Sequence, residues 1–122
     1  MISFKGITYL KRLEKFMPEP YDDQTGKLIP MWCRGATIGY GHLMKYSEWD
    51  DFKNGISEED AVNLLKCDLK PFVRIVEYCI KYKKLTQYET DALVILAFNI
   101  GVSGFDKSSV VKLINHDNVH TP

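Results

Sequence analysis

Two carboxylates near the start of the chain could share acid–base chemistry. Glu14 falls at the end of a segment with helical periodicity, and Asp23 follows nine positions later in the turn-rich sequence YDDQTG. One carboxyl group on a helix end and one on a turn could face each other across a cleft. Such a pair suits cleavage of a glycosidic bond, since one acid protonates the leaving oxygen while the other stays charged and activates water or stabilises the oxocarbenium ion. The chain has 16 acidic residues, so a plain surface role for both stays open at this point.

A glycine-rich stretch, RGATIGYGH, covers residues 34–42 and also holds a threonine and a histidine. Glycine is used where the backbone bends sharply or where another group approaches closely. A phosphate loop, a metal-binding turn or the edge of a substrate cleft could each use this pattern. The phosphate loop lacks the lysine and the following helix that it requires.

Composition limits the class of protein. A chain of 122 residues, 45% of them apolar, predicts one domain with a real core. Lys+Arg and Asp+Glu both number 16, and this neutral balance argues against a nucleic-acid-binding protein. Cys33, Cys67 and Cys79 show no CxxC spacing and no matching histidine pair, so we expect no metal site and reduced thiols in a protein made in the cytoplasm. The charged N-terminal segment indicates neither a signal peptide nor insertion into a membrane.

Residues 1–17 predict one amphipathic helix, because apolar residues recur there at helical spacing: Phe4, Ile7, Leu10, Leu13 and Met17. Pro18 and Pro20 end it. Residues 20–42 mix β-forming residues with glycine and proline, which predicts a small hairpin or a three-stranded sheet.

A long helix is expected from Glu58 to Tyr82, with Ser57 as its N-cap and acidic residues in its first turn. Its apolar side is predicted to face inward through Ala61, Leu64, Leu65, Leu69, Phe72, Val76 and Ile80. Pro71 lies inside this helix and predicts a kink or a break.

A further helix begins with Thr86 and Glu89 in capping-box spacing and ends at Gly101. It is apolar on nearly every side, which indicates the buried centre of a bundle. A last short helix is expected to begin near Ser108. The predicted class is α+β, with a small sheet near the N-terminus beside a helical lobe joined to it by a long helix.

Taken in order, the motifs LEKFMPEPYDDQTG, TIGYGH, LTQYETDALVILAFNIG and GFDKSSVVKLIN resemble phage-type lysozymes of glycoside hydrolase family 24. The resemblance covers nearly the whole chain. It implies a two-lobed lysozyme-like fold without a cofactor, in one domain over residues 1–122. Within it, residues 1–17 would form the first helix, 18–56 the β-lobe and 57–122 a helical lobe that is incomplete at its C-terminus.

The same resemblance implies an endo-acting muramidase, which cuts the β-1,4 bond between N-acetylmuramic acid and N-acetylglucosamine in peptidoglycan and so lyses bacteria. Glu14 looks like the general acid, and Asp23 looks like the second carboxylate, with neighbouring Asp22 expected to be the more superficial acid. Thr37 looks like the residue whose hydroxyl positions the attacking water. In the family the turn after this threonine ends the sheet beside the cleft, so its glycines serve tight turning and no phosphate is needed.

Other positions carry expected roles in structure or substrate binding. His42 resembles a structural histidine of the family, and we expect it to pair with Asp68. Phe98 and Asn99 look like the far wall of the cleft, and Ser108 matches a position that contacts sugar. For these three residues, packing in the core or capping a helix is equally open.

Two departures from the family stand out. Thirteen residues separate Asp23 from Thr37, more than in many members, and the extra residues, about 27–35, contain Trp32. They could lengthen the hairpin, block the site or add Trp32 as a sugar-stacking platform, and Trp32 could equally pack as core. The chain also stops before the helices with which members usually continue, so we expect a longer protein or a partner chain to complete the lobe.

Three functions stay open from the sequence. They are a muramidase, a peptidoglycan-binding or scaffolding domain without turnover, and a lytic transglycosylase, which would need the glutamate but not the aspartate. The presence of both Asp23 and Thr37 favours the muramidase. Without a signal peptide, a phage muramidase would reach the cell wall through a separate holin.

Overall fold

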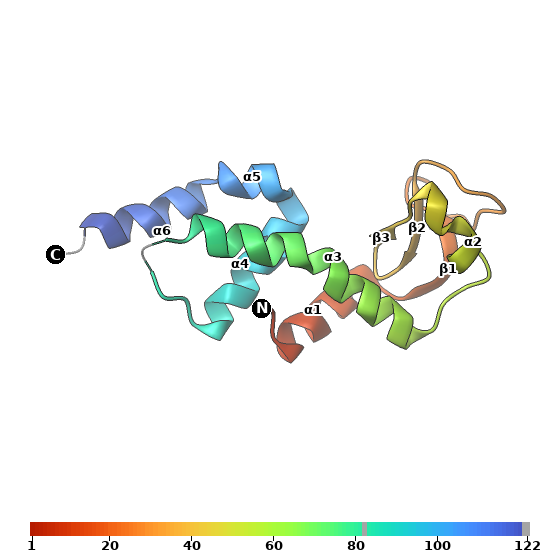
Figure 1. Ribbon diagram of the computed structural model, residues 1–122, viewed down its shortest axis with the longest axis horizontal. Helices are drawn as coiled ribbons and strands as arrows, with labels where there is room; N and C mark the ends of the chain where they lie inside the picture. The colour runs from red at the N-terminus through yellow and green to blue at the C-terminus, as the bar shows by residue number, and fades with distance from the viewer. Residues whose placement is uncertain (82, 121–122) are drawn as a thin grey trace. The chain divides into compact units, whose positions relative to one another are not determined.

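The computed structural model describes residues 1–81 and 83–120, with side chains described through Asn115 apart from residue 82. The elements follow in the order α1 (Phe4–Glu14), β1 (Met17–Asp22), β2 (Ala36–Gly39), β3 (His42–Leu43), η1 (Tyr46–Glu48), α2 (Trp49–Phe52), α3 (Glu58–Cys79), α4 (Gln87–Ile100), α5 (Val102–Asp106) and α6 (Ser109–His120) (Figure 1). The predicted α+β class is confirmed.

The chain divides into two compact units. We call Tyr9–Asp68 the β-unit, and Met1–Thr8 together with Leu69–Pro122 the helical unit. Helices α1 and α3 each contribute residues to both units.

The sheet of the β-unit has three antiparallel strands in the order β1-β2-β3, so the second of the two predicted alternatives, a three-stranded sheet, is present. Thr37 lies opposite Tyr21 of β1 and opposite Leu43 of β3, while Ile38 lies opposite His42. Directly opposed residues point to the same face, and neighbours along a strand point to opposite faces. Tyr21, Thr37 and Leu43 therefore form one row across one face of the sheet, and Ile38 and His42 belong to the other face.

The residues between β1 and β2 first fold back along β1. The Asp22 amide donates to the Lys27 carbonyl at 2.9 Å, and Leu28 forms a bridge with Tyr21. The turn itself is closed by the Gly26 amide, which donates to the Asp22 carbonyl at 2.7 Å. This part of the extra segment therefore lengthens the hairpin, which was one of its expected roles.

The core of the β-unit lies on the Ile38 face of the sheet. Ala36, Ile38 and Met44 are buried, and partly buried residues pack against them: Ile29, Trp32, Cys33, Trp49, Phe52, Ile56 and Leu64. The long helix α3 supplies Leu64 from its first half. It is capped by Ser57, whose hydroxyl accepts from the Asp60 amide at 3.1 Å, as predicted.

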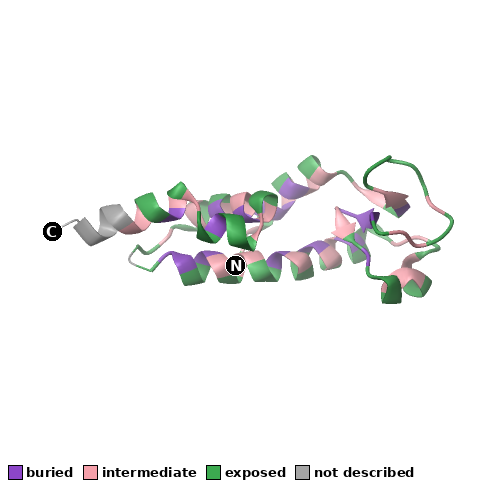
Figure 2. Cartoon of the chain, turned by 90° about the horizontal axis from the view of Figure 1, so that it is seen from above, coloured by how far each residue is buried: buried purple, intermediate pink, exposed green. Residues whose placement is uncertain are grey.

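Helix α3 differs from its predicted length and continuity. It runs through Pro71 without a break and ends at Cys79, and Tyr82 lies outside the described residues. Pro71 lies on the exposed side of the helix. The backbone hydrogen bond that proline cannot donate is therefore lost on the solvent side and not in the core. The end has a clear cause, because the Asn115 amide group donates to the Cys79 carbonyl at 2.7 Å and caps the last turn. Buried and exposed residues alternate along α3, as the apolar spacing predicted (Figure 2).

The helical unit confirms the predicted caps of α4. The Thr86 amide donates to the Glu89 carboxylate at 2.9 Å, the Glu89 amide donates to the Thr86 hydroxyl at 3.2 Å, and Gly101 follows the helix with φ 87°. Complete burial of α4 was wrong. Val94 and Ala97 are fully buried, but Ile100 is 45% exposed because only one side of the helix packs against the described part of the unit.

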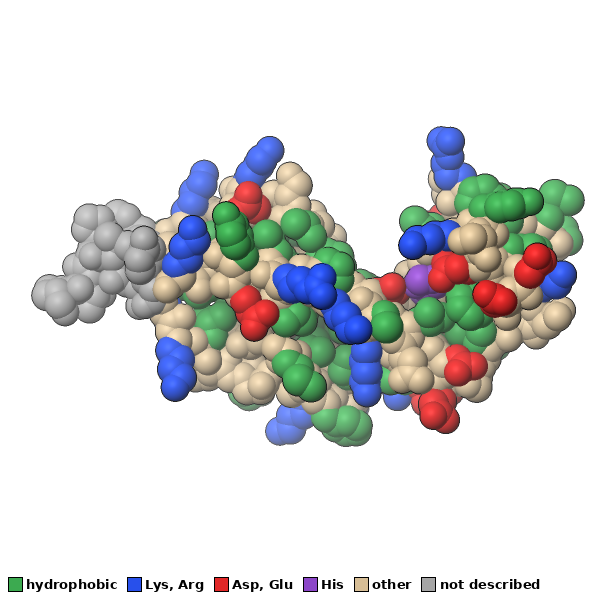
Figure 3. All heavy atoms as spheres, in the orientation of Figure 1, with side chains coloured by type: hydrophobic (Ala, Val, Ile, Leu, Met, Phe, Trp, Pro, Cys, Tyr) green, Lys and Arg blue, Asp and Glu red, His purple; other side chains and the backbone are tan. Residues whose placement is uncertain are grey.

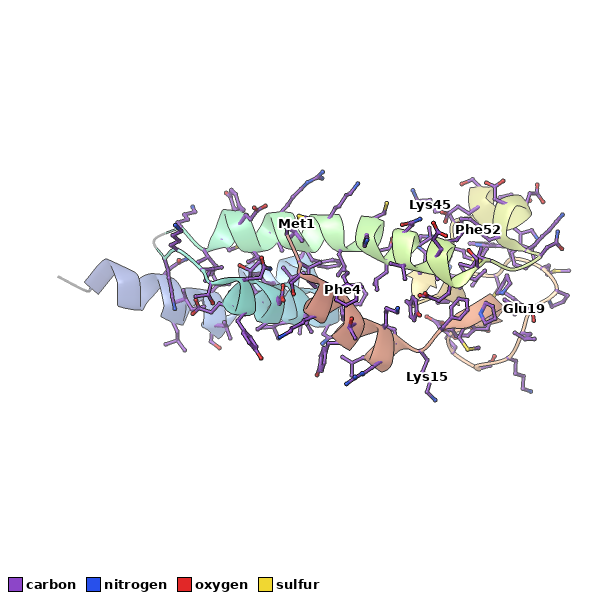
Figure 4. The ribbon with its side chains drawn as sticks, turned by 90° about the horizontal axis from the view of Figure 1, so that it is seen from below. Met1, Phe4, Lys15, Glu19, Lys45 and Phe52 are labelled. Carbon is purple, nitrogen blue, oxygen red and sulfur yellow. The ribbon has the colours of Figure 1, made fainter. Side chains whose placement is uncertain are left out.

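The first helix also ends earlier than predicted. It stops at Glu14, and Phe4 and Leu13, two of the apolar residues at helical spacing, are exposed. The cause lies at Lys15, whose φ of 56° is left-handed and cannot continue an α-helix. Its amide still donates to the Lys11 carbonyl at 3.2 Å, and its side chain points away from the ribbon into solvent (Figure 4). The turn at Lys15 lets the chain enter β1 two residues later.

We predict that Lys15→Gly stabilises the protein. Relief of the left-handed strain, about 1–2 kcal/mol, exceeds the entropy that glycine adds to the unfolded chain, about 0.4–1 kcal/mol. Urea unfolding should therefore show a net gain of about 0.5–1 kcal/mol. The matched control is Lys107→Gly, at a helix end with φ −91°, which should not stabilise. A loss of stability in Lys15→Gly would contradict the assigned strain.

Candidate active site

Glu14 occupies the last position of α1, and its carboxyl group lies against the backbone of Gly41. A Cβ atom added at Gly41 would stand 2.7 Å from Glu14 Oε2, and Gly41 has φ 79°. The left-handed backbone favours glycine here, and the absence of a side chain lets the Glu14 carboxyl group approach. Burial raises the pKa of the Glu14 carboxyl above its ordinary value, so this acid keeps its proton to higher pH than a surface glutamate.

The last turns of α1 are fixed to the start of α3 through one carboxylate. Lys11 Nζ lies 3.3 Å from Glu58 Oε2, and the Tyr40 hydroxyl donates to the same oxygen at 2.9 Å. Tyr40 belongs to the TIGYGH turn, and its ring lies 5.6 Å from that of Phe16. These contacts hold the end of α1 beside the turn that carries Gly41, so the position of Glu14 is set within the β-unit.

Asp23 follows β1 and is exposed. Its amide donates to the Gly35 carbonyl at 3.0 Å. A Cβ atom at Gly35 would meet Oδ1 of both Asp22 and Asp23 at 2.6 Å, so a larger residue there would displace both carboxylates. The expectation that Asp22 is the more superficial acid was wrong, because Asp22 is half-buried and accepts from the Gln24 amide at 3.0 Å to close the turn.

The hydroxyl of Thr37 shares a partner with Asp23. Thr37 is 4% exposed, and its Oγ1 donates to the Gly35 carbonyl at 2.9 Å. One carbonyl oxygen thus holds the Asp23 backbone and the Thr37 hydroxyl together. Because the hydroxyl proton is already donated, its lone pairs remain for a donor such as water.

Sequence reasoning missed Tyr21. It stands opposite Thr37 on the same face of the sheet. Burial, and then the negative charges of Glu14 and Asp23, raise the pKa of its phenol. Tyr21 therefore lies within electrostatic range of both carboxylates. Tyr21 precedes Asp23 by two residues, in a segment expected to pair with TIGYGH. This position in the sequence could have indicated that its side chain lies near the carboxylates.

His42 forms the pair predicted with Asp68 and also a second one. Its Nδ1 lies 2.8 Å from Asp68 Oδ2, and its Nε2 lies 3.1 Å from Glu48 Oε1. The hydrogen bond with Asp68 raises the pKa of His42, burial opposes this, and Glu48 adds to the rise. Burial alone would raise the pKa of Glu48, but hydrogen bonds from the Lys45 amide and from His42 lower it overall. We call His42, Asp68 and Glu48 the imidazole clamp.

Trp32 is half-buried on the core face of the sheet. Its indole Nε1 donates to the Met44 carbonyl at 3.0 Å, and its ring packs against the Ala36–Ile38–Met44 cluster. These contacts support the packing role that the sequence left open. A sugar-stacking role for Trp32 itself is not indicated by its position.

Phe98, Asn99 and Ser108 lie in the helical unit, whereas the carboxylate cluster lies within the β-unit. The Phe98 ring stands nearly perpendicular to that of Phe72 at 5.4 Å, and Asn99 is exposed. The Ser108 hydroxyl accepts from the Val111 amide at 3.3 Å, which caps α6. Their substrate-binding roles stay predictions.

Within the described residues, no three or more His, Cys, Asp or Glu side chains gather in a way that could hold a metal ion. The imidazole clamp involves one histidine between two carboxylates, and its hydrogen bonds account for both ring nitrogens.

Comparison with known proteins defines the class. A family model described as phage lysozyme matches residues 11–121, and the fold superposes on a solved P22 lysozyme and on a solved muramidase domain, each with a TM-score of 0.76. The chain therefore belongs to the phage lysozyme family and is an enzyme of the lysozyme class, with the α+β lysozyme-like fold expected from the sequence.

Individual relatives are endolysins. That of Salmonella phage P22 is 37% identical over 96% of this chain and 75% of its own length, and that of Acyrthosiphon pisum secondary endosymbiont phage 1 is 32% identical over 93% and 69%. The endolysin of Bacillus phage B103 is 34% identical, but the chain spans only 41% of it.

Among solved structures, a P22 lysozyme mutant is 34% identical over 97% of this chain and 75% of that one. The muramidase domain of SpmX from Asticaccaulis excentricus is 30% identical over 98% and 72%. Among the described helices of this chain, none is long and apolar enough to span a membrane.

Gly41→Ala should disable Glu14. The added methyl group would displace the carboxyl oxygen that lies 2.7 Å away, and a misplacement of about 1 Å can lower a catalytic rate about 10²-fold. Gly26→Ala is the matched control, because Gly26 has a similar φ of 74° and nothing within 4 Å of its added Cβ. Both variants should lose about 1 kcal/mol of stability, but only Gly41→Ala should lose peptidoglycan-clearing activity. Equal activity in the two would contradict the contact with Glu14.

The imidazole clamp should make stability depend on pH. Because the folded pKa of His42 is raised, its contribution is fully present below the unfolded value of about 6.5 and is lost as pH rises through the folded value. Because the folded pKa of Glu48 is lowered, its contribution is lost as pH falls through that value.

Urea unfolding of wild type and His42→Gln should therefore differ by about 1–3 kcal/mol near pH 6. The difference should shrink toward pH 9 and also toward pH 3. Glu48→Gln should remove part of it. A difference that stays constant from pH 3 to pH 9 would mean that His42 contributes by packing alone.

Proposed function

We propose that this chain is a peptidoglycan hydrolase that cuts the β-1,4 bond between N-acetylmuramic acid and N-acetylglucosamine and so causes bacterial lysis. The observation that carries the proposal is the pair of carboxylates in different surroundings. Glu14 is half-buried with a raised pKa, whereas Asp23 is exposed in the same unit. The endolysin and muramidase names of the relatives support it.

Glu14 serves as the general acid. A half-buried carboxyl group whose pKa is raised keeps its proton to higher pH than a surface glutamate, so it can donate that proton to the leaving glycosidic oxygen. Gly41 leaves the space in which this group approaches the backbone, and the raised pKa follows from that burial.

Asp23 and Thr37 serve the opposite side of the bond. An exposed carboxylate can accept a proton from water or stabilise the positive charge that develops on the sugar ring. Thr37 already donates to Gly35, so it can accept a hydrogen bond from the same water. The common carbonyl partner fixes the two groups relative to each other before substrate binds.

This arrangement favours hydrolysis over the other functions considered. A lytic transglycosylase would need Glu14 but not Asp23. A binding domain without turnover would need neither carboxylate. We further propose that residues 1–122 act as one lysozyme-like domain, that Phe98, Asn99 and Ser108 contact substrate, and that a holin gives access to the cell wall.

Glu14→Gln should abolish hydrolysis while binding survives. The amide has the same shape but cannot protonate the leaving oxygen, so the rate should fall by at least about 10²-fold. Glu19→Gln is the matched control, because Glu19 is an exposed glutamate on β1 of the same unit. The measurement is release of reducing ends from purified peptidoglycan, with co-sedimentation for binding.

Near wild-type turnover by Glu14→Gln would remove Glu14 from the role of acid. Mass spectrometry of the products separates the remaining functions. Reducing ends indicate hydrolysis, 1,6-anhydro ends would show a transglycosylase, and binding without any product would show a domain without turnover.

A further inference from the structure

One aromatic side chain is displayed at the surface of the β-unit. Tyr46, the first residue of η1, is 74% exposed. Other large apolar residues of the same unit are exposed as well: Leu28, Met31 and Leu43. In Figure 3, hydrophobic side chains gather over the inserted segment and α2 of this unit. Apolar residues gathered at a surface in this way often mark a binding site.

The Tyr46 ring is held by Trp32. The two ring centroids lie 5.6 Å apart and the planes are nearly perpendicular at 89°, a favourable edge-to-face geometry. Trp32 itself cannot move easily, because its indole donates to the Met44 carbonyl and its ring packs on the core. Trp32 therefore supports the exposed ring and is not the exposed ring itself.

The backbone that carries Tyr46 is held by the imidazole clamp. The Lys45 amide donates to Glu48 Oε1 at 2.8 Å, and the Glu48 amide donates to the Lys45 carbonyl at 3.0 Å, which closes the turn around Tyr46. Glu48 is in turn bound to His42, which is bound to Asp68 of α3. A ring fixed at its side chain and at its backbone loses little entropy when a ligand binds.

Tyr46 follows closely in the chain after the strand that pairs with Thr37. Leu43 is 59% exposed and lies opposite Thr37 on the same face of the sheet. It belongs to the edge strand β3, and Tyr46 follows three residues later. Along the chain, the edge strand β3 thus joins the Thr37 row to the turn that carries Tyr46.

We propose that Tyr46, backed by Trp32, is a sugar-stacking platform that binds the glycan strand beyond the bond that is cut. The proposal rests on the proposed function, since a polymeric substrate extends past the reacting sugars. Sugar rings present flat apolar faces, which a fixed aromatic ring can cover.

Tyr46→Ala tests the platform directly. With long peptidoglycan strands it should raise KM about two- to tenfold and leave kcat unchanged, because the ring binds substrate without touching the reacting bond. The rise should be smaller with an oligosaccharide too short to reach beyond the cleavage site. Tyr46→Phe should keep the wild-type KM. Tyr88→Ala is the control, because Tyr88 is 83% exposed on α4.

Trp32→Ala separates support from platform. It should raise KM like Tyr46→Ala and lower the melting temperature sharply, whereas Tyr46→Ala, which removes only the edge-to-face contact, should lower the melting temperature much less. An unchanged KM in Tyr46→Ala would overturn the proposal. So would a change in the sedimentation coefficient of Tyr46→Ala, which would assign this face to contacts between copies of the chain.

Failure of the proposed function can be told apart from failure of the platform. Binding of Glu14→Gln to purified peptidoglycan needs no turnover, so Tyr46→Ala can be compared in that background. Weaker binding there supports the platform even if the wild-type chain makes no product, and equal binding would overturn the platform even if it does.

Discussion

One imidazole ring connects the main parts of the β-unit. His42 leaves the edge strand β3 on the core face, and its two nitrogens meet Asp68 of α3 and Glu48 of η1. A neutral histidine can donate from only one nitrogen, so two carboxylate partners favour the protonated ring. That positive charge holds a strand, a turn and a long helix in fixed relation. Tyr21, Thr37 and Leu43 form the row on the other face of the sheet. Because the same short strands carry both faces, the His42 contacts with Asp68 and Glu48 also fix the position of that row.

The second constraint is the absence of side chains at two glycines. Gly41 lets the Glu14 carboxyl group lie against the backbone, and Gly35 lets the Asp22 and Asp23 carboxylates approach in the same way. The Gly35 carbonyl then binds the Asp23 amide and the Thr37 hydroxyl together. The glycine-rich stretch therefore serves close approach of carboxylates, which explains why an anionic phosphate would be a poor ligand for it.

Local signals in the sequence predicted much of this. The caps at Ser57, Thr86 and Gly101 and the pair His42–Asp68 are present as expected, because capping depends on residues close in the chain and the pair on a matched motif. Non-local features were missed. Tyr21 within electrostatic range of both carboxylates follows from strand register. Glu48 as a second partner of His42 follows from a turn that has no sequence signal. The end of α1 was misplaced because a lysine, and not a glycine, adopts the left-handed conformation there.

The left-handed backbone conformation of Lys15 affects the position of Glu14 as well as the end of α1. Glu14 is the last helical residue and Lys15 turns the chain, so the acid projects from a position that the helix fixes on one side only. The other side is fixed by Gly41 and by the Tyr40–Glu58 hydrogen bond. Strain next to a functional group persists only when the surroundings determine its conformation independently. Here the surroundings do so through Phe16 against Tyr40 and Lys11 against Glu58, which tie the residues on both sides of the strained one to the same turn and helix.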